Sequence, residues 1–289
     1  MPAASPRIAL LPYEKRHVRR IADLPLSELV WPDGVTPPRG TVADLGRDDH
    51  LIVFPSSSIL YGPIFGVKCR LSLIIAEPFA IQARHYRLVR VMSWRFFMVL
   101  THNRWLLDSL KNSRFLASAD PWVQVSDTAR IEKTRHMSLI ASAKRTLEGH
   151  RLRHGIATWV QETNANVDLL GRAYQPLDDK TDGLLPYRFS VIIENVREPG
   201  YFSEKLLDCI LCDTIPIYWG APDIGEFFDM AGMIVCTSQT EIKAAIGRLS
   251  AADYPALLER ARGNRARALV HADHAQRAME LVKEAALRR

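Results

Sequence analysis

Short apolar runs and longer amphipathic stretches alternate along the second half of the chain. The apolar runs predict strands at 137–142, 166–170, 187–194, 214–219 and 232–236. The stretches between and after them predict helices at 149–160, 203–212, 222–229, 239–249, 252–268 and 273–288. Strands that alternate with helices in this way are typical of a parallel sheet with right-handed crossovers.

The first half of the chain is less regular. Buried strands are expected at 51–54, 70–76 and 96–102, with a helix at 104–111 after the last of them. Residues 32–49 are rich in Pro, Gly and Asp and predict a loop, and the polar segment 126–135 predicts a connector. We therefore expect two α/β domains, an N-terminal one over 1–130 and a C-terminal one over 131–289, with a cleft between them.

Composition favours a globular protein without membrane spans. The 289 residues are 47% hydrophobic and 24% charged, and no apolar run approaches the length of a spanning helix. The first eleven residues are interrupted by Pro2, Pro6 and Arg7, so no secretory signal is expected there and a cytoplasmic location follows. Cys209 and Cys212 have apolar neighbours in an expected helix, which favours buried thiols over a metal or redox site.

The charge is basic, at +6. Nucleic acid, anionic lipid and nucleotide phosphates would all suit such a surface, and a peripheral membrane contact at the inner face stays open. No nucleic-acid reader motif is visible and aromatic residues do not alternate with the basic clusters, so no nucleic-acid partner is expected. The apolar stripe of the last helix (Ala275, Ala278, Met279, Val282, Ala286) predicts docking onto a core or bridging of domains rather than lying on a membrane.

Residues 187–220 concentrate the polar chemistry. Asn195, Tyr201, Glu204 and Lys205 cluster between the end of one apolar strand and the start of a helix that Ser203 can cap. Strand ends and helix N-termini face one crevice in open α/β sheets, where anionic ligands bind. A lysine in the first turn opposes the helix dipole. Its presence there therefore indicates an anionic ligand close to Lys205.

The spacing of these residues resembles the donor-binding signature of a known family. The signature has an aromatic–basic–Phe start, a Glu-Asn pair, a Tyr, a Glu-Lys pair and a final apolar strand. This chain supplies Tyr187-Arg188-Phe189, Glu194-Asn195, Tyr201, Glu204-Lys205 and the run 215–220, with Ser203 where the family usually has Thr. The segment 167–172 is similar to an upstream family segment. The family is glycosyltransferase family 10, the α1,3/4-fucosyltransferases; the resemblance is specific over about 137–230 and weak before 130.

The resemblance implies a GT-B fold, with two Rossmann-like domains whose parallel sheets face an interdomain cleft. It implies an inverting transfer of fucose from GDP-fucose to a hydroxyl of a glycan, with GDP as product. Asn195, Tyr201, Glu204 and Lys205 would hold the donor in the C-terminal domain. The partner on the acceptor side would be an oligosaccharide or a lipid-linked, surface-polysaccharide type of glycan, and the oligomeric state stays undetermined.

The same resemblance implies an arginine at the start of the helix near 149, and the chain offers both Arg151 and Arg153. Arg153 fits the spacing to the apolar residues of that helix better, and Arg151 fits an Arg-x-Arg variant. A base on the acceptor side is also implied. Glu77, which follows the strand at 70–76, is the first candidate, and His102 at the end of the strand 96–102 is the second.

No metal site is expected, because Asp48-Asp49 and Asp178-Asp179 lack the Asp-x-Asp spacing of metal-dependent transferases. Arg and Lys can neutralise the leaving diphosphate, so no cofactor is required by this mechanism. Two alternatives remain: a GT-B glycosyltransferase that uses another nucleotide sugar, and an inactive relative that binds glycan or nucleotide.

Overall fold

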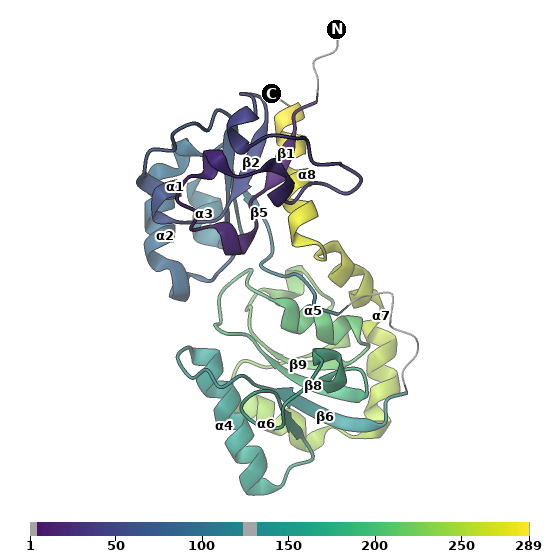
Figure 1. Ribbon diagram of the computed structural model, residues 1–289. Helices are drawn as coiled ribbons and strands as arrows, with labels where there is room; N and C mark the ends of the chain where they lie inside the picture. The colour runs from purple at the N-terminus through teal and green to yellow at the C-terminus, as the bar shows by residue number, and fades with distance from the viewer. Residues whose placement is uncertain (1–4, 124–131, 289) are drawn as a thin grey trace. The chain divides into compact units, whose positions relative to one another are not determined.

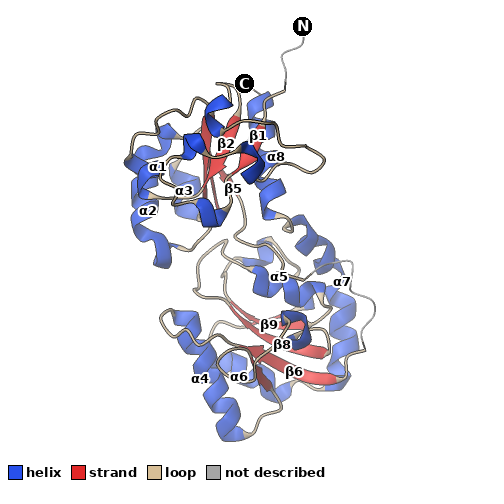
Figure 2. Ribbon diagram, viewed as in Figure 1, coloured by secondary structure: helices blue, strands red, loops and turns tan. Residues whose placement is uncertain are grey.

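A computed structural model describes residues 5–123 and 132–288 of the chain (Figure 1). The chain divides into two compact units. The N-terminal unit comprises Met1–Ala117 together with Asp273–Arg289, and the C-terminal unit comprises Ser118–Ala272. Each unit contains a five-stranded parallel sheet with helices packed against it (Figure 2). Two α/β units with parallel sheets are the architecture expected from the alternating pattern.

The strands of the N-terminal sheet follow one another in chain order, as β1 (Ile8–Leu10), β2 (His50–Val53), β3 (Arg70–Ile75), β4 (Met98–Thr101) and β5 (Ser113–Phe115). The connections contain α1 (Ser57–Tyr61), α2 (Phe79–Met92) and α3 (Arg104–Ser109). Pairing of Ile75 with Thr101 aligns the carboxyl ends of β3 and β4. Residues that follow these two strands therefore lie at one edge of the sheet.

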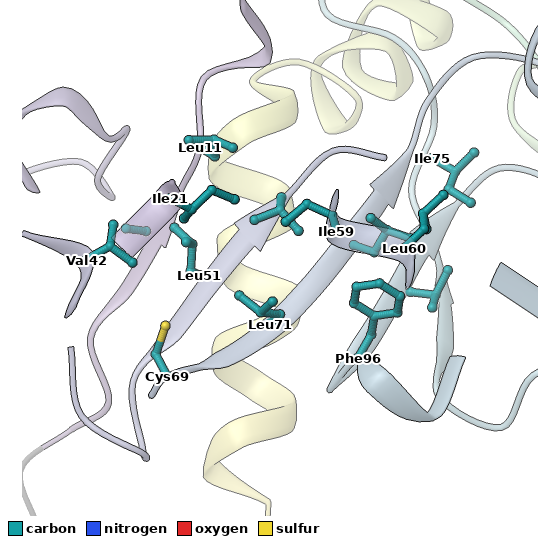
Figure 3. Close-up of a cluster of buried hydrophobic side chains, with 14 of the residues drawn as sticks. Leu11, Ile21, Val42, Leu51, Ile59, Leu60, Cys69, Leu71, Ile75 and Phe96 are labelled. Carbon is teal, nitrogen blue, oxygen red and sulfur yellow. The ribbon is translucent and has the colours of Figure 1, made fainter. Parts of the chain in front are cut away.

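Alternate side chains of this sheet enter two different cores. Leu51, Leu71 and Ile75 pack with α1 and α2 on one face, in the cluster drawn in Figure 3. On the other face, strand residues including Ile52 and Ile74 pack against α8 (His274–Leu287), through Ala278, Met279 and Val282. The apolar stripe of the last helix is thus buried in a core, as predicted.

The N-terminal unit differs from the expected range 1–130 in where it ends and in also containing the C-terminal helix. The first unit ends at Ala117 rather than near 130, and the last seventeen residues return to it. The physical reason is the α8 stripe, which completes the second core of the N-terminal sheet by contacts with β1 and β2. The hydrophobic period shows which face of this helix is buried but not which sheet covers it.

The C-terminal sheet has the order β10-β9-β8-β6-β7. Its strands are β6 (Arg135–Ile140), β7 (Asp168–Leu170), β8 (Tyr187–Ile193), β9 (Ile215–Trp219) and β10 (Ile234–Val235). The helices are α4 (Glu148–Thr163), α5 (Glu204–Leu211), α6 (Gln239–Arg248) and α7 (Tyr254–Val270). The chain leaves β6 toward β7 on one side, whereas β8, β9 and β10 extend on the other. This reversal between β6 and β8 is the place where ligands bind in open α/β sheets.

Most expected elements agree with the structure within one to three residues. The helix expected at 222–229 is wrong, because that segment forms only a 3-10 turn at Ile224–Glu226. The connector expected at 126–135 lies largely outside the described residues, and Arg135 already begins β6. Within the described ranges, none of the helices combines the length and apolar character needed to cross a membrane.

Candidate functional site

The residues singled out between 194 and 205 lie where β8 ends and α5 begins, beside the reversal in strand order. β8 is buried along nearly its whole length, as is usual for a central strand of a parallel sheet. Glu194 and Asn195 follow it directly, and Ser203 caps α5 through its side-chain oxygen. The sequence therefore brings a buried carboxylate, an amide and the start of a helix to one point.

Glu194 fixes this turn from inside the protein. The backbone N–H of Ser203 donates to its Oε1 at 2.9 Å, and the Ser203 hydroxyl donates to its Oε2 at 2.6 Å. Burial raises the pKa of Glu194, and the nearby Lys205 ammonium and the two Ser203 donors act against that rise. The carboxylate is inaccessible to a ligand, so its role is to hold the α5 N-terminus in place.

Lys205 and Glu204 form the accessible part of the cluster. The Lys205 ammonium donates to the Ser203 hydroxyl at 3.1 Å and to Glu204 Oε1 at 3.0 Å, and it lies 3.8 Å from Glu194 Oε2. Burial acts to raise the pKa of Glu204, but the ammonium groups of Lys205 and Lys180 outweigh it, and the pKa lies below its ordinary value. Glu204 is therefore an ionised acceptor next to a cation.

The start of α4 packs directly on the backbone of this turn. The Gly149 N–H donates to the Asn195 carbonyl at 3.0 Å, and a Cβ at Gly149 would lie 1.7 Å from the Glu194 carbonyl oxygen. A Cβ at Gly220 would likewise lie 2.7 Å from Glu194 Cγ. Because both residues are glycines, the start of α4 and the end of β9 can approach Glu194 closely. This close approach brings side chains of α4 to Asn195.

Arg153 is the arginine that α4 turns toward the cluster. Its guanidinium donates to the Ile193 carbonyl at 2.7 Å and to Asn195 Oδ1 at 3.2 Å, and its Nε is buried without a hydrogen-bond partner among the described residues. Only 5% of the residue is exposed. Burial lowers its pKa, and Glu194, Tyr201 and Glu204 oppose that shift. The site therefore contains a buried cation that donates hydrogen bonds to two neutral oxygens, the Ile193 carbonyl and Asn195 Oδ1.

Arg151 lies on a different face of the same helix. It is exposed, and its guanidinium donates to the Thr146 carbonyl at 2.7 Å. Tyr201, by contrast, is 4% exposed and lies close enough to act electrostatically on Arg153. The structure thus brings Arg153, Asn195, Tyr201, Glu204 and Lys205 together and leaves Arg151 at the surface.

Sequence reasoning missed a second cationic network at this site. Lys180 donates to Asp208 Oδ2 at 2.6 Å and lies 3.9 Å from Glu204 Oε1. Asp208 also accepts the backbone N–H groups of Trp122 and Val123 at 2.8 and 3.2 Å. Asp208 stands between apolar residues in the buried part of α5, and a carboxylate buried there needs a cation and hydrogen-bond donors. An acidic residue at this buried position of the predicted helix was therefore the sequence signal that a cation such as Lys180 lies nearby.

Glu77 and His102 belong to the N-terminal unit. Both follow strands at the carboxyl edge of its sheet, Glu77 after β3 and His102 after β4. Glu77 is half-buried, and its carbonyl accepts the Tyr86 hydroxyl at 2.8 Å. His102 is fully buried. The partial exposure of Glu77 suits a proton acceptor better than the complete burial of His102 does.

Cys209 and Cys212 are buried thiols, as predicted, and burial raises the pKa of Cys212 to about 12. Within residues 5–123 and 132–288, no three His, Cys, Asp or Glu side chains lie close enough together to hold a metal ion.

Comparison with known proteins finds short sequence matches to fucosyltransferases. The chain is 39% identical over 51 residues to an α-(1,3)-fucosyltransferase of Helicobacter pylori, which covers 18% of this chain and 11% of the relative. It is 32% identical over 71 residues to a putative fucosyltransferase-like protein of Arabidopsis thaliana, covering 24% and 14%. These matches therefore span only a small part of either relative. No family model matches the chain.

Solved structures of glycosyltransferases match the fold over most of the chain. An α1,3-fucosyltransferase solved with GDP-fucose matches with a TM-score of 0.52 at 16% identity, covering 91% of this chain and 83% of the other. The same kind of enzyme solved with GDP gives 0.53 at 14% identity and the same coverage. The Anabaena protein HepE, solved with UDP-glucose, gives 0.59 at 12% identity over 81% and 78%.

These findings confirm the resemblance to fucosyltransferases and the GT-B fold with two parallel α/β sheets. The structural likeness covers the N-terminal half, where the sequence motifs are weak. At these identities it establishes the fold, and the chemistry has to be argued from the site.

Proposed function

We propose that the chain is an inverting glycosyltransferase that transfers fucose from GDP-fucose to a hydroxyl of a glycan acceptor. The observation that supports this most is the convergence of Arg153 and Lys205, one from α4 and one from α5, beside the ionised Glu204. Two cations can bind a diphosphate, and the Glu204 carboxylate can accept hydrogen bonds from the hydroxyls of a diol. Placed at the reversal in strand order, this combination suits a nucleotide diphosphate sugar.

The donor residues divide into two groups by chemistry. Arg153 and Lys205 would bind the diphosphate and stabilise the charge that GDP gains as it leaves. Glu204 would accept hydrogen bonds from a ribose or sugar diol, because an ionised carboxylate has acceptor sites on both oxygens. Asn195 and Tyr201 would complete the donor site, and Arg151, which is directed to solvent, is assigned no contact.

The proposed reaction is a single displacement at the anomeric carbon of the sugar. The acceptor oxygen forms a bond to that carbon while the bond to the phosphate oxygen breaks, and the hydroxyl proton passes to the Glu77 carboxylate. Inversion follows from attack on the face opposite the leaving GDP. Arg153 and Lys205 supply the charge stabilisation for GDP, so the proposed mechanism needs no metal or other cofactor.

A lipid-linked or surface-polysaccharide glycan is the proposed acceptor class, and the proposed location is cytoplasmic, at the inner face of a membrane. No nucleic-acid partner is proposed.

A second candidate keeps the fold and changes the sugar. HepE, whose structure contains UDP-glucose, gives a higher TM-score than the fucosyltransferases do. The cations and Glu204 recognise phosphate and diol groups, which all nucleotide sugars share, so the base and the hexose have to be determined by experiment.

Thermal unfolding with GDP, UDP, CDP and ADP tests the proposal. A ligand that binds only the folded state at ~100 times its Kd raises the free energy of unfolding by about 2.7 kcal/mol. GDP is expected to raise the melting temperature while the other nucleotides leave it nearly unchanged. A shift with UDP and none with GDP would replace fucose transfer by the second candidate, and no shift with any nucleotide would overturn both.

A further inference from the structure

The basic charge of the chain is concentrated in one stretch of the N-terminal unit. Residues 51–107 contain seven arginines and lysines and a single acidic residue, Glu77, so this stretch alone carries the +6 of the whole chain. The remaining residues carry 31 basic and 31 acidic side chains, so the stretch 51–107 is expected to produce a local positive potential.

Three of the seven basic residues, Arg84, Arg87 and Arg90, lie on α2. Tyr86 and Val89 are its buried positions, whereas Arg84, Arg87 and Val91 are exposed, at spacings that place them on one face of the helix. Trp94, one turn further along, continues the stripe. The indole is 75% exposed and Val91 is 72% exposed. Arginines and large apolar groups thus share one solvent-facing surface.

The last residue of α1 and the loop after it extend this surface. The Arg84 guanidinium lies over the Tyr61 ring, 5.9 Å from its centroid, and Arg95 donates to the Gly62 carbonyl at 2.6 Å. Phe65, three residues further on, is 76% exposed. We call the surface formed by Tyr61, Phe65, Arg84, Arg87, Val91, Trp94 and Arg95 the α2 face.

A hollow of about 380 Å³ opens beside Trp94 and Arg95. Ile64, Val67 and Leu71 contribute aliphatic lining, and Phe96 and Phe97 contribute aromatic lining. Arg70 also lines it, with its guanidinium over the Phe97 ring and 3.9 Å from the carboxylate of Asp48. The hollow therefore combines apolar walls with guanidinium groups.

We infer that the α2 face binds the surface of an anionic phospholipid bilayer. Arginines near such a surface are attracted to the headgroups, and exposed Trp, Phe and Val side chains can enter the headgroup–acyl boundary. The aliphatic lining of the hollow and the exposed Val91 favour lipid over single-stranded nucleic acid, whose bases stack on aromatic rings and gain nothing from aliphatic groups. This inference is independent of the proposed sugar transfer.

Co-sedimentation of the full chain with vesicles tests the inference. Vesicles of phosphatidylcholine alone are compared with vesicles in which part of it is replaced by phosphatidylglycerol. Since one basic residue contributes about 1 kcal/mol, or about fivefold in partitioning, the double variant Arg84→Gln/Arg87→Gln should bind the anionic vesicles about 30-fold more weakly. Arg260→Gln/Arg262→Gln removes the same charge from exposed positions on α7 and should bind like the wild type.

A second readout reports insertion rather than charge. Brominated lipids should quench a part of the tryptophan emission that is absent in Trp94→Phe, while Phe65→Ser should weaken binding without changing the net charge. Equal binding to neutral and anionic vesicles, or equal loss in the α2 and α7 double variants, would overturn the inference. So would tight binding of single-stranded DNA with no binding of vesicles.

Discussion

The side chain of Arg153 provides the sharpest test of the proposed donor site, because Arg151 supplies a matched control two residues away. Both are arginines in the first half of α4. Arg153 is buried against Ile193 and Asn195, whereas Arg151 is exposed and donates to the Thr146 carbonyl. Replacing each by Gln removes the same charge from opposite environments.

The expected size of the effect follows from the contacts of Arg153. A hydrogen bond to a charged group contributes about 1.5–3 kcal/mol, so Arg153→Gln should weaken GDP binding by about 10- to 150-fold. Loss of a charge-stabilising donor from a transition state lowers turnover by about 10²-fold or more. The exposed Arg151→Gln change should alter stability by no more than about 0.5 kcal/mol and leave GDP affinity unchanged.

Isothermal titration with GDP and initial rates of transfer measure the two effects separately. Melting without ligand controls for folding, because Arg153→Gln also removes a donor from the Ile193 carbonyl and Asn195 Oδ1. Equal GDP affinities for the two folded variants would refute the assignment of phosphate binding to Arg153. A loss confined to Arg151→Gln would show that the opposite face of α4 binds the donor.

Three further changes test other parts of the molecule. Glu77→Gln keeps the shape and removes the basicity, so transfer should fall by ~10²–10⁴-fold while GDP affinity is unchanged; normal transfer by this variant would exclude Glu77 and make His102→Ala the next test. Burial lowers the pKa of Lys133 to about 8 from 10.5. The unfolded chain therefore binds more protons between these values, and wild type should gain up to about 3 kcal/mol of stability relative to Lys133→Met as pH rises through that window in urea unfolding; parallel pH profiles would contradict this. Gly149→Ala should lower the melting temperature and GDP affinity together, because its Cβ would collide with the Glu194 carbonyl; a variant with wild-type values for both would contradict the close packing of α4.

Two candidates that sequence spacing left open are separated only by packing. Residues 151 and 153 are about 200° apart around a helix, so a helical period can place either one toward the sheet. Gly149 decides the orientation, since the close approach of α4 to the Glu194 carbonyl turns Arg153 toward Asn195. A glycine near a helix start was visible in the sequence, but the backbone it would approach was not.

The first half of the chain was predicted less well for an identifiable reason. Of α2 only Tyr86 and Val89 are buried, and its remaining face alternates arginine with apolar residues, so the helical period is obscured. β1 is three residues long and β5 is also short, and each is too brief to produce a periodic signal. The strands β2, β3 and β4, which are buried on both faces, were predicted because their apolar runs are continuous.

The part of the site that the sequence predicts best is the part whose contacts are local. Glu194 and Ser203 are nine residues apart, and Lys205 reaches both, so one strand, one turn and one helix start encode this cluster by spacing alone. Arg153 meets Asn195 across 42 residues, and Lys180 meets Asp208 across 28. The Arg153–Asn195 pair forms because β6, which precedes α4, is the neighbour of β8 in the sheet. Glu77, the proposed base, belongs to the other unit and has no local partner in the cluster to fix its spacing, so its assignment depends on a kinetic test.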